Sequence, residues 1–248
     1  MSTIKTCRIL GVNIAVTDMD QTVQYIENNL DELRGKYICV SNVHTTVMAH
    51  DNAQYRNVQN SAAIALPDGK PLSVVSRKRG YSEAERVTGP DLMGELFARE
   101  NGLKHFFFGD KEETLQILQQ NLKEKYPHLK IAGMISPPFR SLSKEEENAY
   151  IQQINDSGAD IIWVGLGAPK QENWMYEHQG MLHGVMIGVG AGFSYHAGLI
   201  KRAPAWMQKI SLEWLYRLMQ DPVRLFKRYF TTNLKFLLLE AKDKGEAL

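Results

Sequence analysis

The sequence predicts an α/β fold in which helices cover both faces of a mostly parallel β-sheet. From residue 8 onward, short β-branched or aliphatic runs alternate with longer segments of helical periodicity, as in chains whose parallel strands are joined by crossover helices. Glycine, proline or a polar residue ends each apolar run. Residues 199–248 differ, because basic and aromatic residues are interleaved there. We therefore expect a Rossmann-like α/β domain over residues 1–198 and a helical appendage over residues 199–248.

Size, charge and cysteine usage narrow the classes of protein. A chain of 248 residues can bury the core of one large domain and still carry a small appendage. Its formal net charge of +1 lacks the positive excess that non-specific nucleic-acid binding needs, so we expect no nucleic-acid partner. Cys7 and Cys39 are too few for a disulfide framework and suit a reducing compartment. Without a signal-peptide pattern or an apolar run of about eighteen residues, we expect a cytoplasmic protein, soluble or peripheral to a membrane.

The secondary structure can be assigned in order along the chain. The apolar runs predict strands at residues 8–16, 37–41, 62–66, 105–108, 130–134, 160–164 and 185–189. Asp18 or Asp20 can cap a helix that runs to about Asn29. Ser143 and Glu146 form a capping-box pattern that opens another helix, and Gly158 supplies its stop. Such sheets bind ligands beyond the carboxyl ends of their strands, so the site is expected in the loops there.

Two of those loops are rich in glycine. Residues 165–172 read Gly-Leu-Gly-Ala-Pro-Lys-Gln-Glu and precede a helix, so their backbone N–H groups and Lys170 favour an anion site over a plain turn. Residues 187–193 fail the dinucleotide fingerprint, because Phe193 stands where the third glycine belongs and no acidic residue follows about twenty positions on. Gly190 and Gly192 still let a diphosphate or sugar approach the backbone closely.

Two aspartate motifs have competing interpretations. Asp18-Met19-Asp20 matches the Asp-x-Asp pattern with which many sugar transferases bind a metal and a diphosphate, but a helix N-cap is wanted at the same place. Asp68 follows an apolar run and lies between Pro67 and Gly69. A turn aspartate that bonds its own backbone is the more common explanation, and a carboxylate that faces a ligand is the other. The histidines show no metal-ligand spacing, so we expect no metal site.

The C-terminal segment also has two interpretations. Between Lys201 and Leu239, eight basic residues outnumber the acidic Glu213 and Asp221, with large apolar residues interleaved. Such helices lie on an anionic membrane surface or close over a phosphorylated ligand. Alternatively, they pack on the core with their lysines and arginines in solvent.

Eight motifs, in this order along the chain, together resemble the WecG/TagA/CpsF glycosyltransferase family. They are the strand-end Asn42, Pro67-Asp68-Gly69, Thr88-Gly89-Pro90-Asp91-Leu92, Phe108-Gly109, Ser-Pro-Pro-Phe-Arg at 136–140, the glycine loops at 165–172 and 188–193, and Lys201-Arg202-Ala203-Pro204 followed by Leu-Glu-Trp-Leu-Tyr-Arg-Leu at 212–218. The resemblance runs from about residue 8 to about residue 230. No single one is specific, but the ordered series is.

The resemblance implies a bacterial enzyme of cell-surface polymer synthesis, such as teichoic acid or exopolysaccharide. It implies transfer of N-acetylmannosamine or a related hexose, with inversion, from a UDP-sugar to an undecaprenyl-diphosphate-linked sugar at the inner face of the cell membrane. The family's catalytic aspartate falls on Asp68, and its substrate-binding residues fall on Asn42, Arg86 and Gln171. Some members carry a threonine two residues before the asparagine, but this chain has Val40 there and lacks that hydroxyl.

The residue types suit this chemistry. A sugar hydroxyl is a poor nucleophile near neutral pH, so an inverting transferase needs a carboxylate to take its proton, and we assign this role to Asp68. The leaving diphosphate needs positive charge, which we assign to arginines rather than to a metal or other cofactor. The predicted substrate contacts are Asn42, Arg86, Gln171, Lys170, Gly190 and Gly192 from the main domain, and Arg202, Arg217 and Arg224 from the appendage. The appendage is then both a lid and a membrane contact.

Two other functions stay open on the sequence. One is a nucleotide-sugar oxidoreductase or epimerase built on the same type of sheet. The other is a non-catalytic protein that binds a lipid-linked sugar through its basic C-terminus. The sequence also leaves open the donor sugar, the acceptor sugar and whether the chain forms a homo-oligomer.

Overall fold

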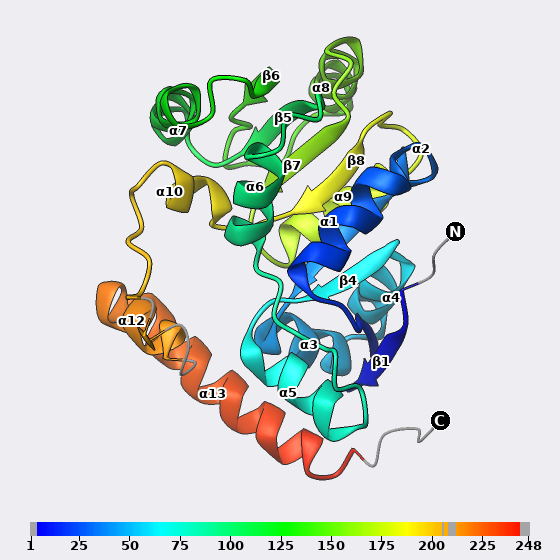
Figure 1. The fold of residues 1–248 in the computed structure, drawn as a ribbon, viewed down its shortest axis with the longest axis vertical. Coiled ribbons are helices and arrows are strands. Elements are labelled where there is room, and N and C mark those ends of the chain that lie inside the picture. Colours follow the sequence, from blue (N-terminus) through cyan, green and yellow to red (C-terminus); the bar gives the residue numbers. More distant parts are fainter. Residues whose placement is uncertain (1–3, 205, 208–211, 244–248) are drawn as a thin grey trace.

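The computed structural model has a twisted sheet with helices on both sides (Figure 1). It describes residues 4–204, 206–207 and 212–243, apart from the side chains of residues 224 and 227–229. In that part of the chain the strands are β1 (Thr6–Ile9), β2 (Val12–Ala15), β3 (Tyr37–Ser41), β4 (Ile64–Pro67), β5 (Lys104–Gly109), β6 (Lys130–Ile135), β7 (Ile161–Gly165) and β8 (Val185–Gly188). Their order is β1-β2-β4-β3-β8-β7-β5-β6, and all pairs are parallel except β1 with β2.

The prediction of a single strand over residues 8–16 is wrong. The structure has a hairpin there, in which Ile9 of β1 lies opposite Val12 of β2. Leu10 and Gly11 form a two-residue turn with φ of 48° and 87°, the left-handed conformations that a type I′ turn requires. Leucine is unusual at such a position. It is held there because its side chain is buried in the core, a contact that the local sequence does not reveal.

Two hydrophobic clusters fill the two faces of the sheet. One cluster lies under α1 (Met19–Asn28), α2 (Leu30–Leu33), α6 (Gly89–Phe97), α7 (Glu112–Lys125) and α10 (Gly192–His196). The other lies under α3 (Val43–Asp51), α4 (Ala53–Ser61), α5 (Lys70–Lys78), α8 (Lys144–Asp156), α9 (Lys170–Glu177) and part of α13 (Pro222–Glu240). In β7, Ile161 and Trp163 belong to the first cluster, and Ile162 and Val164 to the second. Burial on both faces explains why the inner strands are continuous apolar runs.

Local capping motifs act as the sequence predicts. The Asp18 carboxylate accepts the N–H of Gln21 at 2.8 Å and begins α1, so it serves the helix-cap role that competed with a metal site. Ser143 and Glu146 form the reciprocal capping box of α8. Gly158 has φ of 64° between α8 and β7. Each motif fixes where a helix begins or ends, and so where the next strand starts.

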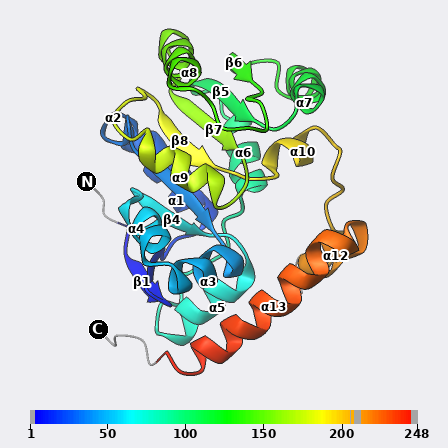
Figure 2. The same cartoon turned by 180° about the vertical axis from the view of Figure 1, so that it is seen from behind.

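The C-terminal helices α12 (Glu213–Gln220) and α13 lie along one side of the molecule (Figures 1 and 2). The long helix α13 packs beside α3 and buries Leu225 and Phe236. Its end is held by Arg79, whose Nη2 lies 2.7 Å from Oε1 of Glu240. Among the described residues, no helix is both long enough and apolar enough to cross a membrane.

Candidate active site

Asp68 is the first residue after β4, at the carboxyl edge of the sheet. Its backbone N–H donates to the carbonyl oxygen of Ser41 at 2.7 Å, which joins the ends of β4 and β3. Gly69, with φ of 103°, then turns the chain sharply into α5. The Asp68 side chain is half-buried, and its carboxylate has no hydrogen-bond or ion-pair partner among the residues that the structure describes. A carboxylate without such partners at this edge is well placed to contact a ligand.

The Asp68 carboxyl has a raised pKa of about 6. Burial is the main cause, because it disfavours the charged form. The positive charges of Arg86 and Arg217 lower the pKa, whereas the negative charges of Glu213 and Asp91 raise it. A carboxyl with a pKa near 6 is mostly ionised at neutral pH and yet basic enough to take a proton.

Asn42 lies beside Asp68, directly after β3. Its side-chain oxygen caps α3 by accepting the N–H groups of His44 and Thr45 at 3.0 and 3.2 Å. The Thr45 hydroxyl accepts the N–H of Asn42, which completes a capping box. The oxygen of Asn42 is therefore used by the helix. Its amide NH₂ group has no partner within the described part of the chain and is available to donate to a ligand.

Arg86 reaches the site from the extended segment between α5 and α6. This segment lies beside the end of β4, where the N–H of Val87 donates to the carbonyl oxygen of Pro67 at 2.9 Å. Arg86 Nη1 lies 2.6 Å from Oε2 of Glu213, the first residue of α12. Arg86, a predicted site residue, thus lies near Asp68, and its ion pair with Glu213 brings the start of α12 to the same place.

Arg202 forms a second ion pair at the same place. Its guanidinium binds both carboxylate oxygens of Asp91 in the first turn of α6, and its Nε lies 3.6 Å from Oε1 of Glu213. Burial raises the pKa of Asp91, but hydrogen bonds from Arg202 and Thr88 outweigh it, and the pKa is lowered. Asp91 is therefore ionised in the folded protein at neutral pH, and Arg202 is fixed by it.

Arg217 of α12 completes the basic cluster. The guanidinium groups of Arg217 and Arg202 lie 5.4 and 5.7 Å from the ring centroid of Tyr195 in α10, within cation–π range. Arg224 is in α13, but its side chain lies outside the part of the chain that the structure describes. Its predicted contact with the diphosphate stays a prediction.

Gln171 and Gly190 meet further along the strand edge. The buried Gln171 side-chain oxygen accepts the N–H of Gly167 at 3.2 Å and that of Gly190 at 3.0 Å, so it holds the loops after β7 and β8 together. Gly192 is buried, and a Cβ there would lie 2.6 Å from the sulfur of Met93. Substrate contacts of Gln171, Gly190 and Gly192 stay predictions, whereas the structure shows what each does for the loops and the packing.

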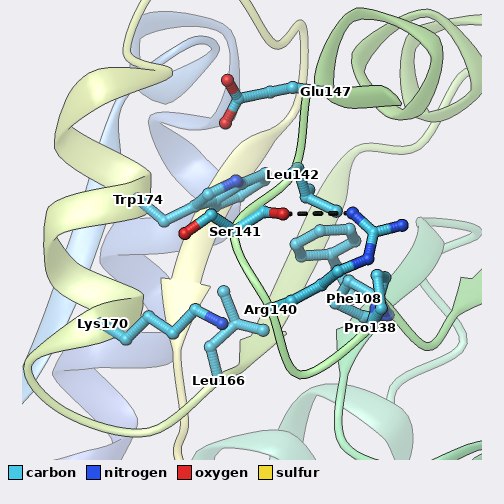
Figure 3. A pocket seen from close by; sticks show the side chains of 10 residues that line it. Phe108, Pro138, Arg140, Ser141, Leu142, Glu147, Leu166, Lys170 and Trp174 are labelled. Carbon is cyan, nitrogen blue, oxygen red and sulfur yellow. Dashed lines mark hydrogen bonds between the residues drawn. The ribbon is translucent and has the colours of Figure 1, made fainter. Parts of the chain in front are cut away.

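Lys170 lies apart from this group, at a cavity of about 220 Å³ beyond β5, β6 and β7. Phe108 and Trp174 stack at 4.5 Å between ring centroids in the wall of this cavity, and Pro137 and Pro138 also line it. Figure 3 shows the Lys170 side chain extending from α9 into the same space. The buried Nε1 of Trp174 has no hydrogen-bond partner among the described residues. The cavity therefore offers stacked aromatic rings and an ammonium group.

The comparison with known proteins decides the family. A sequence model described as the glycosyl transferase WecG/TagA/CpsF family matches residues 7–247. The chain belongs to this family. It is similar to an N-acetylglucosaminyldiphosphoundecaprenol N-acetyl-beta-D-mannosaminyltransferase of Bacillus subtilis (strain 168), with 29% identity over 234 residues, 93% of this chain and 89% of the relative. It is also similar to the protein of that name from Bacillus spizizenii (strain ATCC 23059 / NRRL B-14472 / W23), with 28% identity over 235 residues, 91% of this chain and 90% of the relative.

Membership of the WecG/TagA/CpsF family makes the protein a glycosyltransferase. This overturns the oxidoreductase or epimerase interpretation, which rested on the type of sheet alone. It also overturns the interpretation as a non-catalytic binding protein.

The candidate site contains residues to which the sequence alone assigned no role. Glu213 is one of two acids in a basic segment, and that isolation was its only signal. Asp91 stands in a recognised motif, but its pairing with Arg202 depends on the fold. Among the described residues, no group of three or more histidine, cysteine, aspartate or glutamate side chains is arranged to hold a metal ion. Metal independence stays a prediction.

Proposed function

We propose that this glycosyltransferase moves N-acetylmannosamine from a UDP-sugar to N-acetylglucosaminyl-diphosphoundecaprenol, as the names of its two relatives suggest for acceptor and transferred sugar. The product would enter synthesis of a cell-wall polymer. The observation that carries the proposal is Asp68: a half-buried carboxylate without hydrogen-bond partners in the described chain, at the carboxyl edge of the sheet and beside an arginine cluster.

In this reaction Asp68 acts as the general base. As the acceptor hydroxyl oxygen forms its bond to the anomeric carbon, the hydroxyl proton passes to the Asp68 carboxylate. The bond from the anomeric carbon to the diphosphate oxygen breaks on the opposite face, and UDP leaves with that electron pair. Attack opposite to the leaving group inverts the anomeric carbon. Inversion agrees with the beta-linked product in the relatives' names if the donor is an α-linked UDP-sugar.

The arginines would stabilise the departing diphosphate. Arg86, Arg202 and Arg217 gather at the end of the sheet where Asp68 lies. Charged donors that are already in place lower the energy of developing negative charge without reorganising during the reaction. Arg86 would lie toward the sugar, with the appendage arginines toward the diphosphate.

The donor would extend along the strand edge. From β4, which carries Asp68, to β7, beside the cavity, the order is β4-β3-β8-β7. Three strand spacings amount to roughly 14 Å, which is comparable with the length of a nucleotide-sugar. We place the sugar at Asp68 and the nucleotide toward the glycine loops and the cavity at Lys170.

The lipid-linked acceptor would bring the protein to the inner face of the cell membrane. Helix α13 exposes an apolar stripe at Val223, Phe226, Phe230, Leu234 and Leu237. Their spacing of three or four residues places them on one helix face, opposite the buried Leu225 and Phe236. An exposed apolar stripe on a basic helix is typical of helices that lie in a membrane interface.

A substrate screen tests the proposal. Purified protein would be given UDP- and GDP-sugars, with or without a short-chain polyprenyl-diphosphate N-acetylglucosamine, and nucleotide release would be measured. We expect release only with UDP-N-acetylmannosamine and only when the complete acceptor is present. A polyprenyl diphosphate without the sugar serves as control. Failure of every donor to react in an acceptor-dependent way would refute the proposal.

A further inference from the structure

Glu213 occupies a central position in the site. Its side chain is only 16% exposed. Its carboxylate forms ion pairs with Nη1 of Arg86 at 2.6 Å and with Nε of Arg202 at 3.6 Å. The three residues come from different parts of the chain: the segment before α6, the connection after α10 and the start of α12. One carboxylate therefore ties the appendage to the strand edge where Asp68 lies.

The direction in which Arg86 points matters for Asp68. The charged groups that face Asp68 are Arg86 from the segment before α6, Asp91 from α6, and Glu213 and Arg217 from α12. Arg86 is the strongest of these influences, yet its guanidinium is hydrogen-bonded to Glu213 and not to Asp68. If Arg86 bound Asp68 directly, the ion pair would stabilise the ionised carboxylate and make it a weaker base.

We propose that Glu213 is a positioning residue that holds Arg86 away from Asp68, so that docking of α12 keeps the Asp68 carboxylate able to accept the substrate proton. This inference rests on the proposed function, in which Asp68 is the base. It assigns α12 a role in the chemistry beyond covering the substrate. Arg86 stays close enough to meet the donor while its charge is balanced by Glu213 rather than by the base.

The other end of the appendage offers a matched control. Glu240 of α13 pairs with Arg79 at 2.7 Å, so it also ties the appendage to the main domain through one glutamate and one arginine. Arg79 and Glu240 are not among the groups that face Asp68. Glu240→Gln therefore removes one ion pair between the appendage and the main domain without changing the charges around Asp68.

The test is the pH dependence of kcat/KM between pH 5 and 9 for the wild type, Glu213→Gln, Glu213→Asp and Glu240→Gln. We expect the wild-type rate to fall below a pH of about 6, where Asp68 becomes protonated. In Glu213→Gln a negative charge is lost and Arg86 is released toward Asp68. Both changes lower the pKa of Asp68, so the acid limb should move down by roughly 0.5 to 1 pH unit. Glu213→Asp should keep the limb near its wild-type position, and Glu240→Gln should leave it there.

A double substitution gives an independent check. Adding Arg86→Gln to Glu213→Gln removes the arginine that would pair with Asp68, so the acid limb should return toward the wild-type position even though substrate binding suffers. If Glu213→Gln lowers kcat/KM equally at every pH and leaves the limb unmoved, Glu213 is only a structural contact. Should Glu213→Gln fail to fold by circular dichroism, Arg86→Gln alone and Glu213→Asp decide. Arg86→Gln should move the acid limb up, because a positive charge near Asp68 is lost, and Glu213→Asp should leave the limb in place. An unmoved limb in Arg86→Gln or a lowered limb in Glu213→Asp would overturn the inference.

Asp68→Asn separates failure of this inference from failure of the proposed function. An active Asp68→Asn enzyme would remove the base assignment and the inference with it. An inactive Asp68→Asn enzyme together with an unshifted Glu213→Gln limb would overturn the inference alone.

Discussion

The Asp68 carboxylate is kept partly out of water without a protein hydrogen bond in the described chain, and its pKa is raised to about 6 as a result. An ionised group in such a place costs folding free energy, because water solvates it better in the unfolded chain. The raised pKa that suits Asp68 to the proposed role of base therefore also makes its ionised form unfavourable for the stability of the fold.

We expect Asp68→Asn to stabilise the protein at pH 7.5. The folded pKa is above the unfolded value, so Asp68 contributes favourably only when protonated, and that contribution is lost as the pH rises through about 6. Because the side chain is only half-buried, removal of the charge should raise the free energy of unfolding by about 1 to 2 kcal/mol at pH 7.5. The gain should shrink as the pH falls from 6 to 4. Urea unfolding at several pH values measures it.

Asp18→Asn provides the control for that measurement. Asp18 caps α1, and asparagine caps a helix about as well as aspartate. The free energy of unfolding of Asp18→Asn should therefore differ little from that of the wild type at any pH. Equal stabilities of Asp68→Asn and the wild type at pH 7.5 would contradict a costly charge at Asp68.

Helix α13 has two faces with different roles. Leu225 and Phe236 pack toward α3 and the core, while Phe226, Phe230 and Leu234 are half or more exposed. A stripe of large apolar residues in water is unfavourable unless another surface covers it. We propose that the lipid environment of the acceptor covers it.

Charged substitutions in the stripe test this role. Phe230→Glu combined with Leu234→Glu should reduce binding to vesicles of phosphatidylglycerol and phosphatidylethanolamine by about tenfold or more, because each removes buried apolar area and adds repulsion from anionic lipid. Co-sedimentation with the vesicles measures it. Met181→Glu, a change of an exposed apolar residue away from α13, should bind like the wild type. Undiminished binding by the double variant would show that α13 is not the membrane contact.

At the scale of the whole molecule, the features that the sequence predicts correctly are those that depend on local sequence pattern, such as strands and helix starts. The inner strands are continuous apolar runs, and so recognisable, because both faces of the sheet are buried. Ser143 and Glu146 form a capping box, a pattern of four residues that predicts the start of α8. Asp68 and Asn42 stand in the ordered motifs, and Arg86 follows from the family resemblance. The structure brings the three residues to one edge of the sheet, and their roles stay predictions.

Contacts between distant segments escaped sequence reasoning. The turn at Leu10 is stabilised by burial of the leucine side chain in the core. Leucine is not a typical turn residue, so the sequence predicted one continuous strand there instead of a hairpin. Glu213 gains its position only because α12 folds back onto Arg86, a partner 127 residues away in the chain. Gln171 was assigned to substrate, but its link to Gly167 and Gly190 needs two strands to lie side by side first.

In the proposed function, the base, the arginines and the apolar helix lie on one molecule so that a lipid-linked acceptor can meet a nucleotide-sugar. The transfer step itself is where these parts must act together. Its rate under single-turnover conditions is free of the steps of product release and membrane exchange.

The most direct measurement is therefore single-turnover transfer of labelled N-acetylmannosamine from UDP to the lipid-diphosphate acceptor, by the wild type and by Asp68→Asn. We expect the variant to transfer the sugar about 10² to 10⁴ times more slowly, since it has lost its general base. Its calorimetric affinity for the UDP-sugar should be equal or higher, because a negative charge has left the neighbourhood of a diphosphate. Transfer by Asp68→Asn at the wild-type rate would contradict the role assigned to Asp68.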